Sequence, residues 1–307
     1  MNNRKTISLV LGSGGARGYA HIGVINELEN QGYKIESIAG SSMGALIGGL
    51  YATDKLQEFE EWVLSLDYYE IFKLISFSSK SGGIVDAQKV FDKLKVLMGD
   101  IQIEDLPIKY RAVATDLNTQ KEVLFEKGSL IDAIRASVGI PTIFAPILKD
   151  EMILIDGGVL NPLPINSVLD DDTDLTIAVN LDANIPNHYN IIIPDKQKSR
   201  EELLYEKFGR LMDKAQAMLP PDLLNIINET MAKRGKKSKE NEFKRQDIFF
   251  ILSKTLDTAQ SVLSLYSMQK QKADIVIDIP RDSCEFYEFT KAYEMIEIGK
   301  MATKEKL

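Results

Sequence analysis

The sequence has very little cysteine and histidine: one cysteine and two histidines in 307 residues. Cys284 cannot form a disulfide within the chain or a cysteine-based zinc site, which favours a reducing compartment. Two histidines leave little room for a His-rich metal centre. They also limit any Ser-His-Asp triad to His21 or His188.

Long apolar runs are missing as well. No window reaches the roughly 18 apolar residues that a spanning helix needs, and the first five residues lack a signal-peptide pattern. Acidic residues outnumber basic ones, 45 to 37, and the net charge of −8 argues against nucleic-acid binding. The 44% hydrophobic and 27% charged residues are typical of a globular chain, which excludes a disordered one. We therefore expect a soluble, cytoplasmic protein, with peripheral membrane binding left open.

Short apolar runs alternate with helical patterns through the N-terminal half. Residues 7–11 and 35–39 are predicted strands, and residues 19–30 and 45–51 carry apolar side chains at helical spacing. Two successive strand–turn–helix units predict an α/β fold with a mostly parallel central sheet and helices on both faces. Further apolar runs, typical of strands buried on both faces, predict strands at 110–115, 152–155, 175–179 and 274–277.

The pattern changes between about residues 184 and 255. An apolar helical face at 204–218 and a basic segment at 233–245 replace the strand pattern, which resumes at residue 274. We interpret this region as a helical insertion within a single domain, residues 1–307. An apolar stripe beside a basic cluster indicates a lid or membrane-contact element. The alternative is an ordinary helical layer with a solvated basic loop.

The first glycine-rich segment, GSGGARG at 12–18, lies between the first predicted strand and the first predicted helix. Backbone N–H groups at such a position favour negative charge. A dinucleotide site is excluded because Arg17 stands where G-x-G-x-x-G requires its third glycine, and no P-loop Gly-Lys-Ser/Thr follows. Two interpretations stay open: an oxyanion hole formed by the N–H groups of Gly14 and Gly15, or merely a tight turn.

The second glycine-rich segment, Gly40-Ser41-Ser42-Met43-Gly44, follows the second predicted strand and opens the second predicted helix. In that setting G-x-S-x-G indicates a nucleophile elbow, a strained turn that exposes the serine above a sheet. The flanking glycines permit the turn, so Ser42 is the predicted nucleophile. Ser41 is interpreted as a turn residue.

A nucleophilic serine needs a general base. Asp156-Gly157-Gly158 follows an apolar run, which would place Asp156 at a strand end, although Asp-Gly-Gly is also a turn signal. Asp156 could take the Ser42 proton directly, or Ser42, Asp156 and His188 could form a triad. His188 lies in a polar loop and is interpreted as exposed. The other histidine, in the first predicted helix, is interpreted as a packing or capping residue.

Taken in order, these blocks resemble the patatin-like phospholipase family. The resemblance covers residues 5–182, and the tail at 274–299 is similar to bacterial members related to neuropathy target esterase. The resemblance rests on three motifs: G-x-G-G-x-R-G at 12–18, G-x-S-x-G at 40–44 and D-G-G at 156–158. Two further blocks, at 114–117 and 135–146, also agree with the family.

The resemblance implies a Ser–Asp dyad, with Ser42 as nucleophile and Asp156 as general base, and no catalytic histidine, metal or other cofactor. It implies an oxyanion hole at Gly14 and Gly15. Residues that would support these four are Gly12, Arg17, Gly18, Gly40, Gly44, Gly157 and Gly158. Arg17 would either order the glycine-rich loop or attract an anionic headgroup.

The expected reaction is hydrolysis of an acyl ester of phospholipid or lysophospholipid through an acyl-serine intermediate. Asp116 and Ser137 also match family blocks and are expected to hold the shell of the site together. The same site could serve an acyltransferase or a thioesterase. Besides the hydrolase and these two enzyme alternatives, a non-catalytic membrane-binding protein also stays open.

Overall fold

The computed structural model describes residues 5–66, 70, 88–141, 144–194 and 248–307. The chain divides into two compact units, residues 1–192 with 256–307, and residues 193–255. The predicted apolar face at 204–218 and basic segment at 233–245 lie outside the described residues. The insertion at 184–255 therefore stays a prediction.

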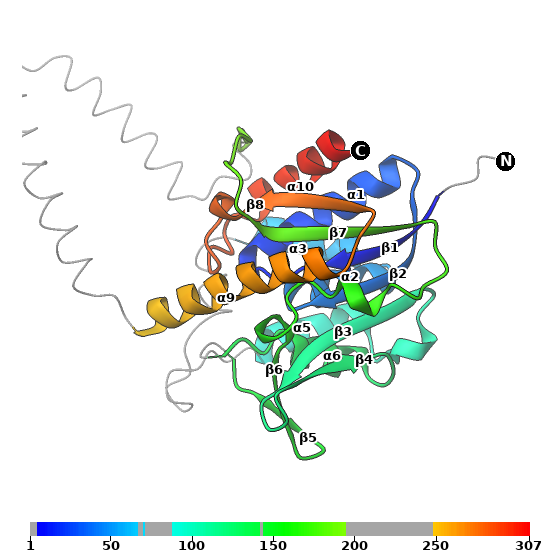
Figure 1. The fold of residues 1–307 in the computed structure, drawn as a ribbon, viewed down its shortest axis with the longest axis vertical. Coiled ribbons are helices and arrows are strands. Elements are labelled where there is room, and N and C mark those ends of the chain that lie inside the picture. The colour runs from blue at the N-terminus through cyan, green and yellow to red at the C-terminus, as the bar shows by residue number, and fades with distance from the viewer. Residues whose placement is uncertain (1–4, 67–69, 71–87, 142–143, 195–247) are drawn as a thin grey trace, which may run out of the picture. The chain divides into compact units, whose positions relative to one another are not determined.

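The first unit is built on an eight-stranded sheet in the order β5-β6-β3-β2-β1-β7-β8, with β4 paired to β3 (Figure 1). Strands β1, β2, β3, β7 and β8 run parallel, while β4, β5 and β6 are antiparallel to their neighbours. The strands are β1 Thr6–Leu11, β2 Lys34–Ser41, β3 Lys109–Asp116, β4 Lys121–Phe125, β5 Ile147–Lys149, β6 Met152–Asp156, β7 Leu175–Ala183 and β8 Ile275–Pro280.

Seven α-helices and several 3-10 turns accompany these strands in the described residues. The helices are α1 Ala20–Asn30, α2 Met43–Ala52, α3 Leu56–Ser65, α5 Gln88–Met98, α6 Leu130–Ser137, α9 Ile248–Lys270 and α10 Ala292–Lys306. The 3-10 turns are η1 Gly15–Tyr19, η3 Ile103–Asp105, η4 Gly157–Val159, η5 Ile165–Ser167 and η7 Arg281–Ser283.

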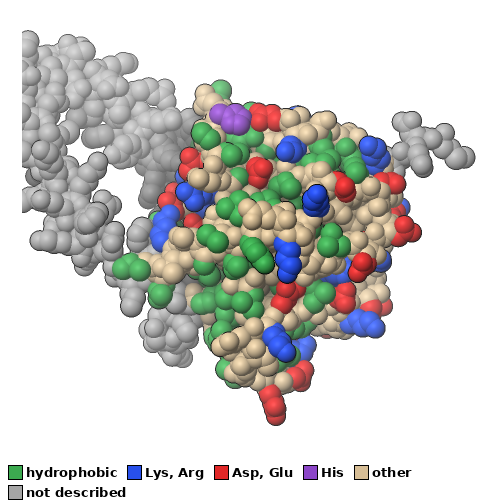
Figure 2. All heavy atoms as spheres, in the orientation of Figure 1, with side chains coloured by type: hydrophobic (Ala, Val, Ile, Leu, Met, Phe, Trp, Pro, Cys, Tyr) green, Lys and Arg blue, Asp and Glu red, His purple; other side chains and the backbone are tan. Residues whose placement is uncertain are grey.

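Alternation along β1 shows that both faces of the sheet are covered. Leu9 and Leu11 are fully buried in the main core, together with apolar residues of α1, α2 and α10. Val10 points the other way, into a second cluster where Met268 of α9 packs. In Figure 1, α9 crosses in front of the sheet, and apolar side chains are visible on the surface along it in Figure 2. The predicted α/β fold, with a mostly parallel sheet and helices on both faces, is confirmed.

The six predicted strands are all present, with their ends displaced by up to four residues. The largest displacement is in β7, which continues to Ala183 rather than ending at residue 179. None of the described helices has the length and apolar character needed to cross a membrane.

One feature of the sheet brings distant segments together. Residues 112–116 of β3 pair with β4. Some of these same residues also pair with β2, at 112–113, and the others pair with β6, at 114–116. Because a strand has only two edges, β2 and β6 share the opposite edge of β3. β2 ends there at the pair Ser41–Val113, and β6 ends at the pair Ala114–Asp156, running in the opposite direction. The carboxyl ends of β2 and β6 therefore meet head to head.

Candidate active site

Ser42 occupies a strained turn between β2 and α2. Its φ of +54° and ψ of −122° lie in a region that side chains rarely adopt, at a cost of about 1–3 kcal/mol. Its N–H donates to Ser137 Oγ at 2.9 Å, which helps to hold the turn. A Cβ at Gly44 would lie 2.0 Å from Leu11 O, so only glycine lets α2 start so close to β1. The G-x-S-x-G segment thus has the geometry of a nucleophile elbow.

Asp156 reaches Ser42 from the facing end of β6. Ser42 Oγ donates to Asp156 Oδ2 at 2.5 Å, and both residues are fully buried. The close approach needs a glycine after the aspartate, because a Cβ at Gly157 would lie 2.1 Å from Val113 O. The structure therefore joins two side chains that are 114 positions apart in the chain.

The environment of Asp156 favours its protonated form. Burial raises the pKa of this carboxyl to about 7, against the opposing effect of hydrogen bonds from Ser42 and Gly158. Gly158 N–H donates to the second carboxyl oxygen, Oδ1, at 2.7 Å and fixes the orientation of the group. A carboxyl poised near neutral pH can both accept and return a proton.

The glycine-rich loop leaves two backbone donors available. Within the described part of the chain, the N–H groups of Gly14 and Gly15 have no acceptor, whereas those of Ser13 and Ala16 on either side each donate to a carbonyl, at 2.8 and 2.9 Å. Gly15 has a φ of +56°, and a Cβ there would lie 2.4 Å from Phe286 O. Adjacent unpaired N–H groups in a loop are what an oxyanion hole requires.

Arg17 is part of the interior and is only 1% exposed. Its guanidinium forms ion pairs with Asp182, at 2.8 Å, and with Asp257 of α9, and it donates to Cys284 O at 3.2 Å. These contacts tie the glycine-rich loop to the end of β7 and to α9. They favour the loop-ordering role over attraction of a headgroup.

The two histidines differ in their surroundings, and neither contacts Ser42. His21 is buried, and its Nε2–H donates to Gly12 O at 2.8 Å. Burial lowers the pKa of His21 to about 4, so the ring is neutral. His188 is exposed, with Nε2 3.1 Å from Glu305 Oε2. The structure therefore brings Asp156 to the serine, and not His188.

Ser137 contacts Ser42 directly, whereas Asp116 lies at the end of β3 and contacts the following turn and β6. Asp116 accepts hydrogen bonds from the N–H groups of Asn118 and Thr119 in the turn after β3, and from that of Ile153 in β6. Hydrogen bonding, first of all from the Thr119 hydroxyl, holds the pKa of Asp116 below its usual value. These contacts keep β6 in register with β3, while Ser137 supports the elbow.

Gln260 of α9 is a neighbour of the site that no sequence motif indicated. It is 1% exposed, and its Oε1 accepts from Ser13 Oγ at 3.4 Å. A Cβ at Gly158 would lie 2.4 Å from Gln260 Nε2, so the amide covers the residue that orients Asp156. No sequence motif predicted Asp182 and Asp257 as the ion-pair partners of Arg17 either, because α9 and the end of β7 contain no motif of the family.

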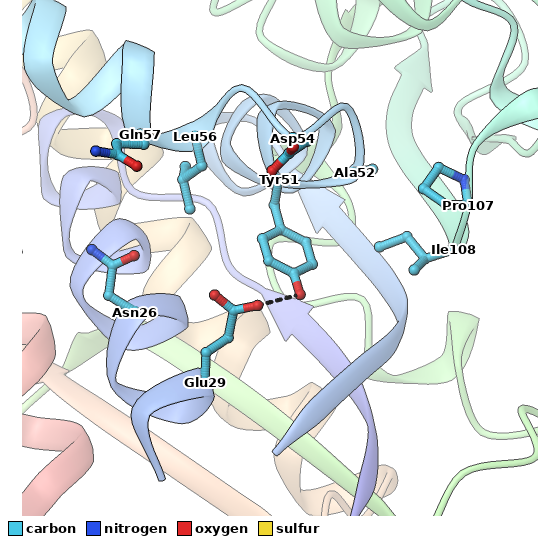
Figure 3. A pocket seen from close by; sticks show the side chains of 9 residues that line it. All are labelled: Asn26, Glu29, Tyr51, Ala52, Asp54, Leu56, Gln57, Pro107 and Ile108. Carbon is cyan, nitrogen blue, oxygen red and sulfur yellow. Dashed lines mark hydrogen bonds between the residues drawn. The ribbon is translucent and has the colours of Figure 1, made fainter. Parts of the chain in front are cut away.

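A surface cavity of about 320 Å³ lies elsewhere, at the carboxyl end of α2 (Figure 3). Tyr51 and Glu29 line it, joined by a hydrogen bond of 2.8 Å. Ser42 stands at the opposite end of this ten-residue helix, about 15 Å away. The cavity is therefore separate from the paired Ser42 and Asp156. Among the described residues, no group of three or more acidic, histidine or cysteine side chains is arranged to hold a metal.

Comparison with known proteins identifies the family. Residues 9–169 match the sequence model of the Patatin-like phospholipase family. An uncharacterised NTE family protein of Mycobacterium tuberculosis is 36% identical over an alignment of 327 positions, gaps included, which covers 98% of this chain and 91% of that protein. Neuropathy target esterase sws of Drosophila melanogaster is 30% identical over 192 residues, 56% of this chain and 13% of the fly protein.

A solved structure, VipD from Legionella pneumophila, overlaps 57% of this chain and 50% of its own, at a TM-score of 0.35 and 15% identity. The family match covers more than half of this chain, and the mycobacterial relative aligns with nearly all of it. The protein is therefore a member of the patatin-like phospholipase family, a membership that implies hydrolysis of lipid acyl esters.

Proposed function

We propose that this protein hydrolyses the acyl esters of phospholipids or lysophospholipids, with Ser42 as nucleophile and Asp156 as general base. The observation that carries the proposal is the direct hydrogen bond of 2.5 Å between Ser42 Oγ and Asp156 Oδ2. It is made at an elbow whose strained backbone is typical of serine hydrolases. The match to the Patatin-like phospholipase model supports this class of substrate.

In the first half-reaction, ionised Asp156 accepts the Ser42 proton while Oγ forms a bond to the acyl carbon. The carbonyl electrons move onto oxygen, and the N–H groups of Gly14 and Gly15 donate to that oxyanion. When the tetrahedral intermediate collapses, the ester C–O bond breaks. Asp156 returns the proton to the departing alcohol, and the acyl group stays on Ser42.

In the second half-reaction, water replaces the alcohol. The water oxygen attacks the acyl-serine carbon while Asp156 accepts a proton from that water. The N–H groups of Gly14 and Gly15 again stabilise the oxyanion that forms. Collapse breaks the bond to Ser42 Oγ, which regains its proton from Asp156, and the fatty acid is released. A single carboxyl thus acts as base and acid in turn, which the pKa of about 7 suits.

The burial of the site has a consequence for substrate entry. Ser42 and Asp156 are fully buried, so an ester bond reaches Ser42 Oγ only when the surrounding segments move apart. Exclusion of water in the closed form would strengthen the contact between the oxyanion and its donors.

The test is hydrolysis of a panel of phospholipids and lysophospholipids by wild type, Ser42→Ala and Asp156→Asn. We expect both variants to lose at least about 10³-fold in kcat. His188→Ala is the matched control, because an exposed histidine paired with Glu305 should be dispensable. Wild-type rates in Ser42→Ala, or a loss in His188→Ala equal to that in Asp156→Asn, would contradict the dyad.

A further inference from the structure

Helix α9 has several polar residues on its buried side, beside Met268, which packs against the second core cluster. From residue 256 onward, Asp257 pairs with Arg17, Gln260 contacts Ser13, and Ser267 Oγ donates to Leu163 O at 2.8 Å. Gln260 and Ser267 are 1% and 8% exposed, and Ser264 between them is 3% exposed. The inner face of this helix is therefore held to the rest of the unit by hydrogen bonds and an ion pair as well as by the packing of Met268.

The outer face of α9 exposes three large apolar side chains. Val262, Leu265 and Tyr266 are 61%, 51% and 60% exposed, and their spacing of three and four residues places them on one stripe. A surface helix normally has the reverse arrangement, with its apolar stripe turned to the core. Figure 2 shows apolar side chains along this helix on the visible face.

The charges around the outer face have one sign. Asp257 is the sole acidic residue between positions 256 and 270, and it faces inward to Arg17. Lys270 is exposed and lies over the Tyr266 ring, 5.9 Å from its centroid, and Lys272 is exposed two residues later. An apolar stripe containing tyrosine and bordered by lysine matches the boundary between acyl chains and headgroups of a bilayer.

We infer that the outer face of α9, namely Val262, Leu265 and Tyr266 with Lys270 at its end, docks on a lipid bilayer. Three large apolar side chains dominate this stripe, with Thr258 and Gln269 exposed beside them, and Lys270 borders the stripe. This combination favours the headgroup boundary of a bilayer over a soluble protein partner. The inference rests on the proposed function, since a lipid hydrolase must meet its substrate at a membrane surface.

The inner face of α9 contacts the candidate active site. Gln260, on the inner face, contacts Ser13 of the glycine-rich loop and covers Gly158, which orients Asp156. A bilayer that receives the outer face therefore lies one helix diameter, about 10 Å, from the loop and the base.

The test compares two matched pairs of substitutions, each exchanging one valine and one leucine for serine. The docking pair is Val262→Ser with Leu265→Ser. The control pair is Val96→Ser with Leu148→Ser, whose side chains are 82% and 77% exposed on other elements. Binding to sedimented vesicles of phosphatidylcholine and phosphatidylserine is measured with Ser42→Ala in every protein, so that no lipid is consumed.

We expect the docking pair to weaken vesicle binding by about tenfold, because both side chains lose apolar area that enters the bilayer. The control pair should bind like the parent protein. Lys270→Gln should weaken binding about fivefold on vesicles that contain phosphatidylserine and leave binding to phosphatidylcholine alone unchanged.

Hydrolysis of a short-chain soluble ester, with Ser42 intact, separates the possible failures. Wild-type rates for the docking pair would show that the fold and the active site are preserved. If those rates are normal but vesicle binding is also unchanged, the docking surface is overturned while the proposed function stands. If wild type cleaves neither soluble nor lipid esters, the proposed function fails instead. A dimer that the docking pair dissociates in analytical ultracentrifugation would assign the face to a second copy and overturn the inference.

Discussion

Replacing Asp156 with asparagine should abolish turnover and yet stabilise the folded protein at neutral pH. The carboxyl is fully buried, and its pKa rises from 3.8 to about 7 on folding. A shift of about three units corresponds to about 4 kcal/mol of unfolding free energy. Because the folded state binds the proton more tightly, this stabilisation is complete below pH 3.8 and is lost as the pH rises through about 7.

Asparagine has nearly the same shape and no charge. Its carbonyl can accept from Gly158 N–H, and its amide can donate to Ser42 Oγ, so the two contacts of Asp156 have counterparts. Between pH 5 and about pH 7, Asp156 is ionised in the unfolded wild type but still protonated in the folded one. This interval spans about two of the three pH units that separate the two pKa values. The unfolding free energy of Asp156→Asn should therefore gain about 3 kcal/mol relative to wild type over that range.

Urea denaturation at several pH values between 5 and 8, followed by fluorescence of the single tryptophan, Trp62 of α3, measures this difference. Asp116→Asn is the control, since hydrogen bonds hold the pKa of Asp116 below its usual value and its charge does not change above pH 5. Parallel curves for wild type and Asp156→Asn would refute the reasoning, because Asp156 would then be ionised throughout.

Three further predictions concern activity. kcat/KM for a soluble ester should rise with pH through about 7, the pKa of Asp156, and a rate independent of pH from 5 to 8 would contradict an aspartate base with that pKa. Gly15→Ala, which places a Cβ 2.4 Å from Phe286 O at a φ of +56°, should lower kcat by about 10²-fold or more, measured beside a melting curve that reports folding. Ser137→Ala removes the acceptor of Ser42 N–H, so kcat should fall about tenfold with little change in KM, and rescue by Ser137→Thr should follow if the hydroxyl is what matters.

The local geometry at Ser42 was predictable from a short stretch of sequence. A G-x-S-x-G segment between an apolar run and a helical pattern admits few backbone paths, and the structure shows the strained turn between β2 and α2. Residues 7–11 and 35–39 were also predictable as buried strands, because strands of a parallel sheet are covered on both faces and therefore have continuous apolar runs of that length. Helices α3, α5 and α6, which lie between the first and last motif blocks, and α10 near the C-terminus were not assigned from the sequence.

The sequence by itself determined the elbow, the glycine-rich loop, the Asp-Gly-Gly block and the family, because each depends on a few adjacent residues. The residues themselves left open whether Asp156 or His188 serves Ser42, and only the family resemblance implied Asp156. Only the tertiary structure decided which side chain reaches the serine, since β2 and β6 meet on one edge of β3 through pairings between residues far apart in the chain. The partners of Arg17 and the inverted polarity of α9 were decided in the same way. Long-range pairing and burial depend on the whole packed unit, and no short segment encodes them.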